Sequence, residues 1–290
     1  MDARQFLGLE PTDDPLRWRL PVTAAVSTPG RFLYGGCGLA AGIVAMEAAA
    51  GRPTVWATAQ YLAYAPTGSV LDWEVVLAAV GGGTTQARAI GRLGDKEVLT
   101  VNAALGRRQL EASGTWVEPP VVPRPEDCPP QEFPAMFADT VLVRVEHRVA
   151  RGRPISELDG QPGDAHSAFW ARLPGHLDPS AATLAVIGDY VSGGCSQPLG
   201  MRTMGRSLDN TLRVVRLVPT TWVLCDIQMH ALAGGFGHGQ AHLWAEDGTL
   251  LATASQSISV RLWNDDTIFT SPSLARTAGP GPSGPAAQDS

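Results

Sequence analysis

Two segments of the chain, residues 70–103 and 222–256, are rough copies of each other. Each copy contains, in the same order, an apolar run, a glycine cluster, a Gln-Ala run, a charged turn and a third apolar run. The copies lie about 150 residues apart, which is too long for one unit of a repeat array and suits a duplicated domain. Two fused copies commonly rebuild a homodimer within one chain, so we expect a ligand site in the cleft between the halves.

The composition is sufficient for two domains with apolar cores. The chain has 290 residues, of which 44% are hydrophobic and 17% are charged. Its net charge is −6, and it has no block rich in lysine or arginine. This pattern argues against general affinity for nucleic acid or for an anionic membrane.

Cysteine spacing and the first residues of the chain indicate a cellular compartment. The four cysteines are scattered without a Cys-x-x-Cys pair, which favours buried, reduced thiols. They are Cys37, Cys128, Cys195 and Cys225. The N-terminus lacks the apolar region of a signal peptide, and no apolar run approaches the roughly 18 residues of a membrane span. We therefore expect a soluble, cytoplasmic protein with no membrane span.

The first half of the chain predicts one buried helix followed by strands. Residues 35–50 are rich in alanine and carry a single charge, Glu47, before a Gly-x-Pro stop. This pattern is typical of a helix that is buried on nearly all sides. Gly and Pro punctuation then separates four predicted strands, at residues 54–64, 69–80, 84–93 and 96–105.

The second half repeats this pattern after a proline-rich segment. Seven prolines fall within residues 111–137, as expected for an extended linker between domains. A helix is predicted at residues 179–191, with Asp178 as its N-cap and Pro179 in its first turn. The predicted strands are residues 141–149, 168–173, 204–218, 221–232, 240–246 and 250–263.

These patterns predict an α+β protein of the double hotdog class, in which two antiparallel sheets each wrap round a central helix. We predict an N-terminal hotdog domain at residues 1–110 and a proline-rich linker at 111–137. A C-terminal hotdog domain is predicted at residues 138–265. The Pro-, Gly- and Ser-rich tail at 266–290 is predicted to be disordered.

Several short motifs resemble the acyl-CoA thioesterase II (TesB-like) family. They are residues 32–36 before the first helix, residues 207–210, residues 246–253 and Gln256. The resemblance covers roughly residues 30–263 without the linker, and it lies in the order and spacing of the motifs. It implies an enzyme that converts acyl-CoA and water into a carboxylic acid and CoA, as part of fatty acid and lipid metabolism.

The family resemblance also implies a site of three residues that hold and activate water: Asp189, Ser207 and Gln256. Asp189 follows an apolar helical stretch, so burial is expected to raise its pKa into the range of a general base. The hydroxyl of Ser207 and the amide of Gln256 would orient water or polarise the thioester carbonyl. The chain departs from the family at Asn210, where histidine is common, and in a longer segment at 211–219.

Other candidate residues are weaker. Three histidines at even spacing, His230, His238 and His242, come without a carboxylate-bearing metal motif. The glycine clusters at 81–83 and 234–235 stand between strands, as turns do, and no basic residue adjoins Cys195. Glu47 is a weak second candidate for chemistry. We therefore expect neither a metal nor a cofactor.

Three alternatives remain open at this point. In the first, Asp189 has a purely structural role and bonds only the backbone amides of residues 192–194. In the second, the protein is a noncatalytic acyl-thioester-binding double hotdog, in which the pocket is kept but the water site is not. A hotdog hydratase or dehydratase is the third reading, although neither predicted helix contains the histidine that this chemistry uses.

The expected partners are the substrate acyl-CoA, the product CoA and a second copy of the chain. Arg202 and Arg206 are candidate contacts for the CoA phosphates. Trp73, Val75 and Leu77 are expected on the outer side of the first sheet, where they would drive homo-oligomer formation.

Overall fold

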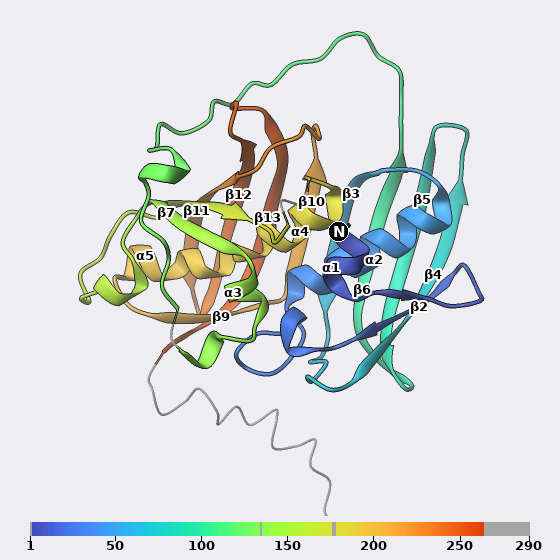
Figure 1. Cartoon of the computed structure of the whole chain (residues 1–290), viewed down its shortest axis with the longest axis horizontal. Helices are drawn as coiled ribbons and strands as arrows, with labels where there is room; N and C mark the ends of the chain where they lie inside the picture. The colour runs from blue at the N-terminus through green and yellow to red at the C-terminus, as the bar shows by residue number, and fades with distance from the viewer. Residues whose placement is uncertain (1, 134, 176–177, 264–290) are drawn as a thin grey trace, which may run out of the picture.

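The computed structural model describes residues 2–133, 135–175 and 178–263 (Figure 1). In this part of the chain, thirteen strands form one antiparallel sheet in the order β1-β2-β4-β5-β6-β3-β10-β13-β12-β11-β8-β7, with β9 paired to β13. Strands β3 and β10 are neighbours at the centre, so the sheet joins the two halves of the chain. The described helices include none that is long and apolar enough to cross a membrane.

The first half contains α1 (Ala3–Leu7), β1 (Glu10–Pro11), β2 (Arg17–Pro21), η1 (Ala24–Val26), α2 (Gly35–Ala50), β3 (Thr54–Tyr61), β4 (Val70–Val80), β5 (Thr84–Leu93) and β6 (Lys96–Gly106), where η denotes a 3₁₀ helix. The connecting region contains η2 (Pro125–Asp127) and η3 (Ala135–Phe137). The second half contains α3 (Val141–Arg144), β7 (Glu146–Arg151), η4 (Ile155–Glu157), β8 (His166–Arg172), α4 (Ala181–Gly188), η5 (Asp189–Cys195), α5 (Ser196–Leu199), β9 (Thr203–Ser207), β10 (Asp209–Val214), β11 (Val223–Ala233), β12 (Phe236–Ala245) and β13 (Leu250–Leu262).

The two sequence copies form the same three-stranded meander. The first copy gives β4, β5 and β6, and the second gives β11, β12 and β13. The halves meet at Thr58 of β3 and Thr211 of β10, whose hydroxyl oxygens are 2.7 Å apart although the residues are 153 positions apart. Helices α2 and α4 lie next to each other on the same face of the sheet (Figure 1).

Helix α2 is buried because its small residues let the strands approach it closely. A Cβ at Gly42 would lie 2.9 Å from Val101 and 3.3 Å from Trp73, so only glycine permits this contact. The helix ends at Gly51, which adopts a left-handed conformation with φ of 62°. These observations confirm the predicted helix and its stop signal.

The start of the second half differs from the prediction. Residues 141–149 were expected as a strand, but Val141–Arg144 forms the helical turn α3 before β7 begins at Glu146. The turn places Val141 and Val145 on one buried side, and Arg144 donates to the carbonyl of Ala25 at 2.8 Å. These contacts with the N-terminal segment outweigh the β propensity of the valines.

The second buried helix is shorter than predicted. Its N-cap is Ser180, which forms a capping box with Thr183, and not Asp178. The α-helix ends at Gly188, and the chain continues as the 3₁₀ helix η5 instead of remaining α-helical to residue 191. The predicted strand 204–218 is also divided into β9 and β10, which ends at Val214, because the pairing with β13 shifts by one residue between Ser207 and Thr211.

The outer face of the sheet corrects the basis for self-association. Trp73 and Val75 are 1% and 2% exposed and face α2, so they are not on the outer side of β4 as expected. Asp72 and Glu74 occupy that outer side and pair with arginines of β2. Homo-oligomer formation remains a prediction, but these residues do not support it.

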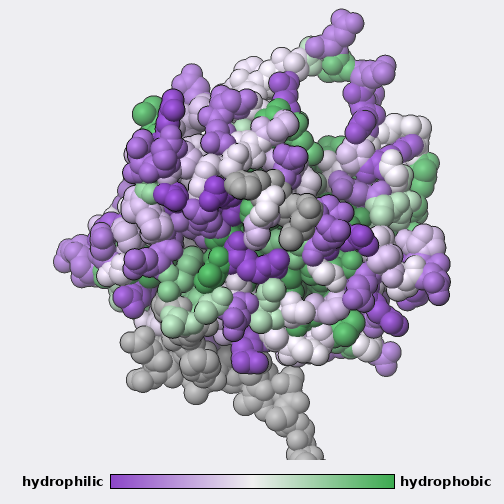
Figure 2. Space-filling model, viewed as in Figure 1, coloured by the Kyte–Doolittle hydropathy of each residue, from purple (hydrophilic) through white to green (hydrophobic). Residues whose placement is uncertain are grey.

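The proline-rich segment contacts the outer face of the second half. Trp170 donates its indole N–H to the carbonyl of Pro123 at 2.9 Å, and Val122 packs against a cluster built around Trp170, Trp222 and Trp244. On the face of the molecule that Figure 2 shows, hydrophilic residues surround hydrophobic patches. The disordered tail predicted at 266–290 lies outside the described residues.

Candidate active site

Asp189 stands where α4 ends, at the boundary between the two halves. Residues 181–188 of α4 are all buried, and Gly188 packs so closely on β13 that a Cβ would lie 3.0 Å from Ala254. The change from α-helix to η5 directly after Gly188 leaves Asp189 as the C-cap residue, with 3% of its surface exposed. Its carboxylate is therefore held by protein groups and not by bulk solvent.

Both carboxylate oxygens of Asp189 accept hydrogen bonds. Oδ1 accepts from the side-chain amide of Asn210 at 3.0 Å and from that of Gln256. Oδ2 accepts from the backbone N–H of Gly36 at 2.6 Å. Gly36 belongs to the first turn of α2, so a helix N-terminus of the first half points at a carboxylate of the second half.

The close approach of α2 to Asp189 depends on glycine. A Cβ at Gly36 would lie 2.8 Å from the Ala185 carbonyl oxygen and 2.8 Å from the Asp189 Cβ. At Gly35, a Cβ would lie 2.9 Å from Asp189 Oδ2 and 3.0 Å from the Tyr61 hydroxyl. The Gly35-Gly36 pair in the sequence is therefore a requirement of this contact.

Burial gives the Asp189 carboxyl an unusual acidity. Removal from water raises its pKa from 3.8 to about 7, against the lowering effect of the bonds from Gly36, Gln256 and Asn210. A carboxyl group with this pKa exchanges its proton near neutral pH, which is the property that a general base needs.

Gln256 connects the other two predicted residues. Its carbonyl oxygen accepts the backbone N–H of Ser192 at 3.0 Å, which fixes the orientation of the side-chain amide. Its amide nitrogen donates to Asp189 and, at 3.3 Å, to the hydroxyl of Ser207. The structure thus joins the three residues predicted from the sequence in one hydrogen-bonded cluster.

Two members of the cluster were not identified from the sequence. Asn210 was noted only as a departure from the family pattern, yet it donates to Asp189. Gly36 belongs to the motif at residues 32–36, but the sequence analysis assigns it no role at the site, although the Gly35-Gly36 pair is a signal of close backbone approach. Within the described residues, the Tyr61 hydroxyl and Asn210 Oδ1 are buried without a hydrogen-bond partner.

The weaker candidates lie elsewhere or have structural contacts. Glu47 accepts the backbone N–H of Thr54 at 2.8 Å near the C-terminus of α2, at the opposite end of the helix from Gly36. Burial raises the pKa of the Cys195 thiol to about 11, which leaves it protonated. All four cysteines are buried and free, as predicted. The described residues include no group of three or more His, Cys, Asp or Glu side chains arranged to hold a metal ion.

The predicted glycine turns are confirmed. Gly81–Gly83 connects β4 to β5, and Gly234 and Gly235 connect β11 to β12 with φ angles of 58° and 81°. Positive φ at both positions is typical of a tight hairpin turn. The glycines therefore shape hairpins and form no phosphate cradle at a helix N-terminus.

Comparison with known proteins identifies the family. The family model of the acyl-CoA thioesterase C-terminal domain matches residues 125–260, the half that carries the cluster. A solved structure assigned as a thioesterase, from Novosphingobium aromaticivorans, is 30% identical, with a TM-score of 0.77 over 87% of this chain and 97% of that chain. The chain belongs to the acyl-CoA thioesterase family. It is a thioester hydrolase.

More distant structures share the fold. A hot dog fold protein of unknown function from Alicyclobacillus acidocaldarius is 21% identical, with a TM-score of 0.77 over 89% of this chain and 97% of that chain. The acyl-CoA thioesterase II TesB2 of Mycobacterium marinum is 17% identical, with a TM-score of 0.69 over 91% of this chain and 99% of that chain. No functionally curated protein matches the chain. The thioesterase therefore has a hotdog fold with an antiparallel sheet.

Proposed function

We propose that this thioesterase hydrolyses acyl-CoA to a carboxylic acid and CoA, with Asp189 as the general base. The buried Asp189 carboxyl, with a pKa of about 7 and direct bonds to Gln256 and Gly36, is the observation that carries the proposal. A base of this strength is half ionised near neutral pH, where it both removes and returns a proton.

The acceptor sites of the carboxylate suggest which oxygen acts. A carboxylate has about four acceptor positions, and Oδ1 already accepts two bonds while Oδ2 accepts one. The remaining position on Oδ2 takes a proton from water as the water oxygen attacks the thioester carbonyl carbon. The C–S bond of the tetrahedral intermediate then breaks, and the CoA sulfur receives the proton from Asp189.

Ser207 and Gln256 have different parts in this scheme. Both N–H groups of the Gln256 amide are used, toward Asp189 and Ser207, so Gln256 positions these two residues. Ser207 accepts a bond from Gln256, which leaves its own O–H free to donate to water or to the thioester oxygen. No acyl-serine intermediate is needed, because a thioester is reactive enough for an activated water.

Tyr61 is a second donor for the thioester oxygen. Its hydroxyl is buried beside Asp189 and has no partner among the described residues. Burial and the nearby Asp189 raise its pKa well above the ordinary value, so the hydroxyl keeps its proton and can donate a hydrogen bond.

We further propose that the two halves are fused hotdog units within a double hotdog, with the domain limits expected from the sequence: 1–110, 111–137 and 138–265. The mirrored strand order and the contact of Thr58 with Thr211 support this reading. The residue 153 positions earlier is the equivalent in the first half. It is Gly36 for Asp189, Thr54 for Ser207 and Ala103 for Gln256. The first half therefore has no equivalent base, and we propose one active site per chain.

The cellular setting follows from the chemistry. Four buried free thiols are typical of a reducing compartment, and acyl-CoA is the substrate, so we propose a cytoplasmic enzyme of fatty acid metabolism. A second copy of the chain remains the expected partner, and sedimentation at micromolar concentration tests it.

The test is the release of CoA thiol from a panel of acyl-CoA substrates by the wild-type protein, Asp189→Asn and Glu47→Gln. Asp189→Asn should lose about 10²–10⁴-fold in rate, as expected for a general base. Glu47→Gln is the matched control, since its carboxylate bonds only backbone at the far end of α2. Binding of acyl-CoA without release of CoA would favour the noncatalytic alternative, and full activity in a folded Asp189→Asn would refute Asp189 as the base.

A further inference from the structure

A row of side chains on the inner face of the sheet leads away from Gln256. In the strand register, Gln256 of β13 pairs with Gly239 of β12, and Gly239 pairs with Met229 of β11. Gly237 is the next inward-facing position of β12 and pairs with Ile258. Two consecutive inner positions of β12 therefore have no side chain.

Met229 and Cys195 occupy the space above these glycines. A Cβ at Gly239 would lie 2.7 Å from Met229 Sδ and 3.1 Å from Met229 Cε. A Cβ at Gly237 would lie 3.0 Å from Cys195 Sγ. The Met229 side chain thus lies flat across the glycine floor, where it is 6% exposed.

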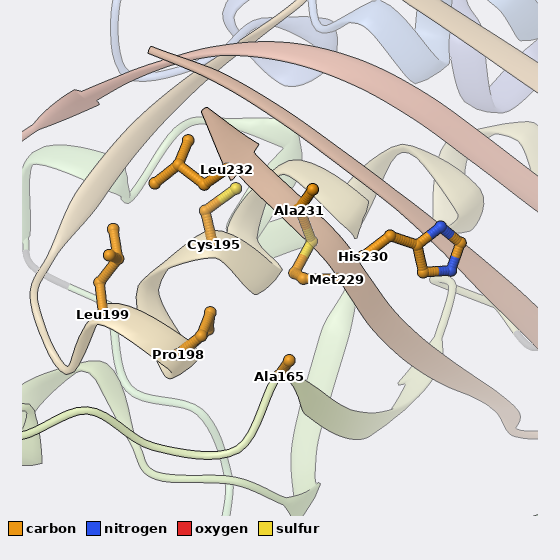
Figure 3. Close-up of a pocket in the computed structure, with 8 residues that line it drawn as sticks. All are labelled: Ala165, Cys195, Pro198, Leu199, Met229, His230, Ala231 and Leu232. Atoms are coloured by element: carbon orange, nitrogen blue, oxygen red, sulfur yellow. The ribbon is translucent and has the colours of Figure 1, made fainter. Parts of the chain in front are cut away.

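An apolar cavity of about 130 Å³ begins at Met229 (Figure 3). It lies between β11 and the segment formed by η5 and α5. Figure 3 shows Cys195, Pro198 and Leu199 on the helical segment, with Met229 on the strand β11 facing them. Ala165 lies beside Met229, since its carbonyl accepts the Met229 backbone N–H at 2.8 Å. The helical wall begins at the active centre, because η5 starts with Asp189, and β11 lies two strands from the strand that carries Gln256.

The first half of the chain provides an internal comparison. Its residues equivalent to Gly239 and Gly237 are Ala87 and Thr85, and the residue equivalent to Met229 is Leu77. At these three equivalent positions, the glycines and the flexible methionine therefore occur only in the half that carries Asp189. A floor without side chains below a movable thioether suits a ligand that displaces the methionine.

We propose that Met229 is a movable stopper, and that the acyl chain of the substrate runs over the glycine floor and displaces Met229 to enter the cavity. This inference rests on the proposed thioesterase function. Two strand spacings, about 10 Å, separate Gln256 from Met229. A saturated chain advances about 1.3 Å per carbon, since its bonds of about 1.5 Å zigzag. About four carbons therefore reach the Met229 thioether, which lies over Gly239 one strand spacing from Gln256. About eight carbons reach β11 and the start of the cavity.

The volume of the cavity indicates how many carbons of the acyl chain it covers. An apolar cavity of about 150 Å³ accommodates a six-carbon ring, so the cavity beyond Met229 takes roughly four to six further carbons. The substrate class is therefore a straight-chain acyl group of about eight to fourteen carbons.

The experiment measures binding of S-alkyl-CoA thioethers, which cannot be hydrolysed, from S-butyl-CoA to S-tetradecyl-CoA. The readout is the ratio of the Kd of S-butyl-CoA to the Kd of S-dodecyl-CoA. Met229→Ala should raise this ratio about tenfold or more, since each newly buried methylene contributes about fourfold in affinity. Ala165→Leu, which adds a side chain to the lining of the cavity beside Met229, should lower the ratio by a similar factor.

Leu77→Ala is the matched control, because it makes a comparable truncation at the equivalent position of the first half. It should keep the wild-type ratio. An unchanged ratio in both Met229→Ala and Ala165→Leu, or an equal change in Leu77→Ala, would overturn the stopper. If the thioethers bind with the expected ratios while no acyl-CoA is hydrolysed, the proposed function fails and the acyl path stands.

Discussion

Replacing Asp189 by asparagine should stabilise the folded protein at neutral pH while it removes hydrolysis. Burial raises the pKa of the Asp189 carboxyl from 3.8 to about 7. The folded protein therefore holds a proton that the unfolded chain has already released. For such a group, stability is highest below the unfolded-state pKa, falls as the pH rises toward 7, and is constant above that value.

The magnitude follows from the size of the shift. A difference of about three pKa units corresponds to about 4 kcal/mol of unfolding free energy lost above pH 7. At about pH 5 the loss is only about 1.5 kcal/mol, because the folded carboxyl is still protonated. Asparagine carries no charge at either pH, so it does not incur this loss.

Asparagine has its own cost, which does not depend on pH. Its amide N–H₂ replaces an oxygen that accepts a bond, either from Gly36 or from Asn210 and Gln256. A buried donor left facing another donor costs about 1–3 kcal/mol. We therefore expect Asp189→Asn to be more stable than the wild type by about 1–3 kcal/mol at pH 8.

Urea unfolding of both proteins at pH 5 and pH 8 tests this reasoning. The stability gap between Asp189→Asn and the wild type should widen by about 2.5 kcal/mol from pH 5 to pH 8. The lost hydrogen bond cancels in this difference, and so do the other titrating groups that both proteins share. The same gap at both pH values would refute the raised pKa of Asp189 and, with it, the argument for Asp189 as a base near neutral pH.

Three further predictions concern the same cluster. The kcat/KM of the wild type should rise about tenfold per pH unit below pH 7 and level off above it. Asn210→Ala should move the midpoint of this pH profile upward, because the Asn210 bond lowers the pKa of Asp189, and rate profiles from pH 5 to 9 measure both effects. Ser207→Thr should keep activity and Ser207→Ala should lose most of it, and an inactive Ser207→Thr with an acyl-serine detected by mass spectrometry would contradict water activation. Gly36→Ala should lower both the melting temperature and kcat, because its Cβ would lie 2.8 Å from the Ala185 carbonyl oxygen and from the Asp189 Cβ. The control Gly38→Ala should be close to neutral, because its closest contact is the end of the Leu99 side chain, and equal effects of the two variants would contradict the close-contact argument.

The regular parts of the fold were predictable from local patterns. Alanine-rich residues 35–50 and the punctuated strands after them required only helix propensity, apolar periodicity and Gly or Pro boundaries. The errors occur where a distant contact decides the conformation. Residues 141–144 form a helical turn because they pack on the N-terminal segment, and Trp73 faces inward because β4 covers α2, neither of which is visible in a local window.

The candidate site was predictable to a different degree for each residue. Family spacing identified Asp189, Ser207 and Gln256, and the structure brings them into contact. Asn210 differs from the family residue, so resemblance could not give it a role. Gly36 contributes a backbone N–H from the other half, and a backbone group leaves no side-chain signature in the sequence.

The contact between Gly36 and Asp189 also explains why a duplicated chain suits this chemistry. These residues are 153 positions apart, the same spacing as Thr58 and Thr211, and both pairs touch, so equivalent positions of the two halves face each other. In a dimer of identical halves, this position would meet its own copy. Two aspartates would place two buried carboxylates together and force one to stay protonated, and two glycines would leave no base. A fused chain can instead keep aspartate in one half and glycine in the other, so that a single carboxylate is placed against a helix N-terminus with room to approach it.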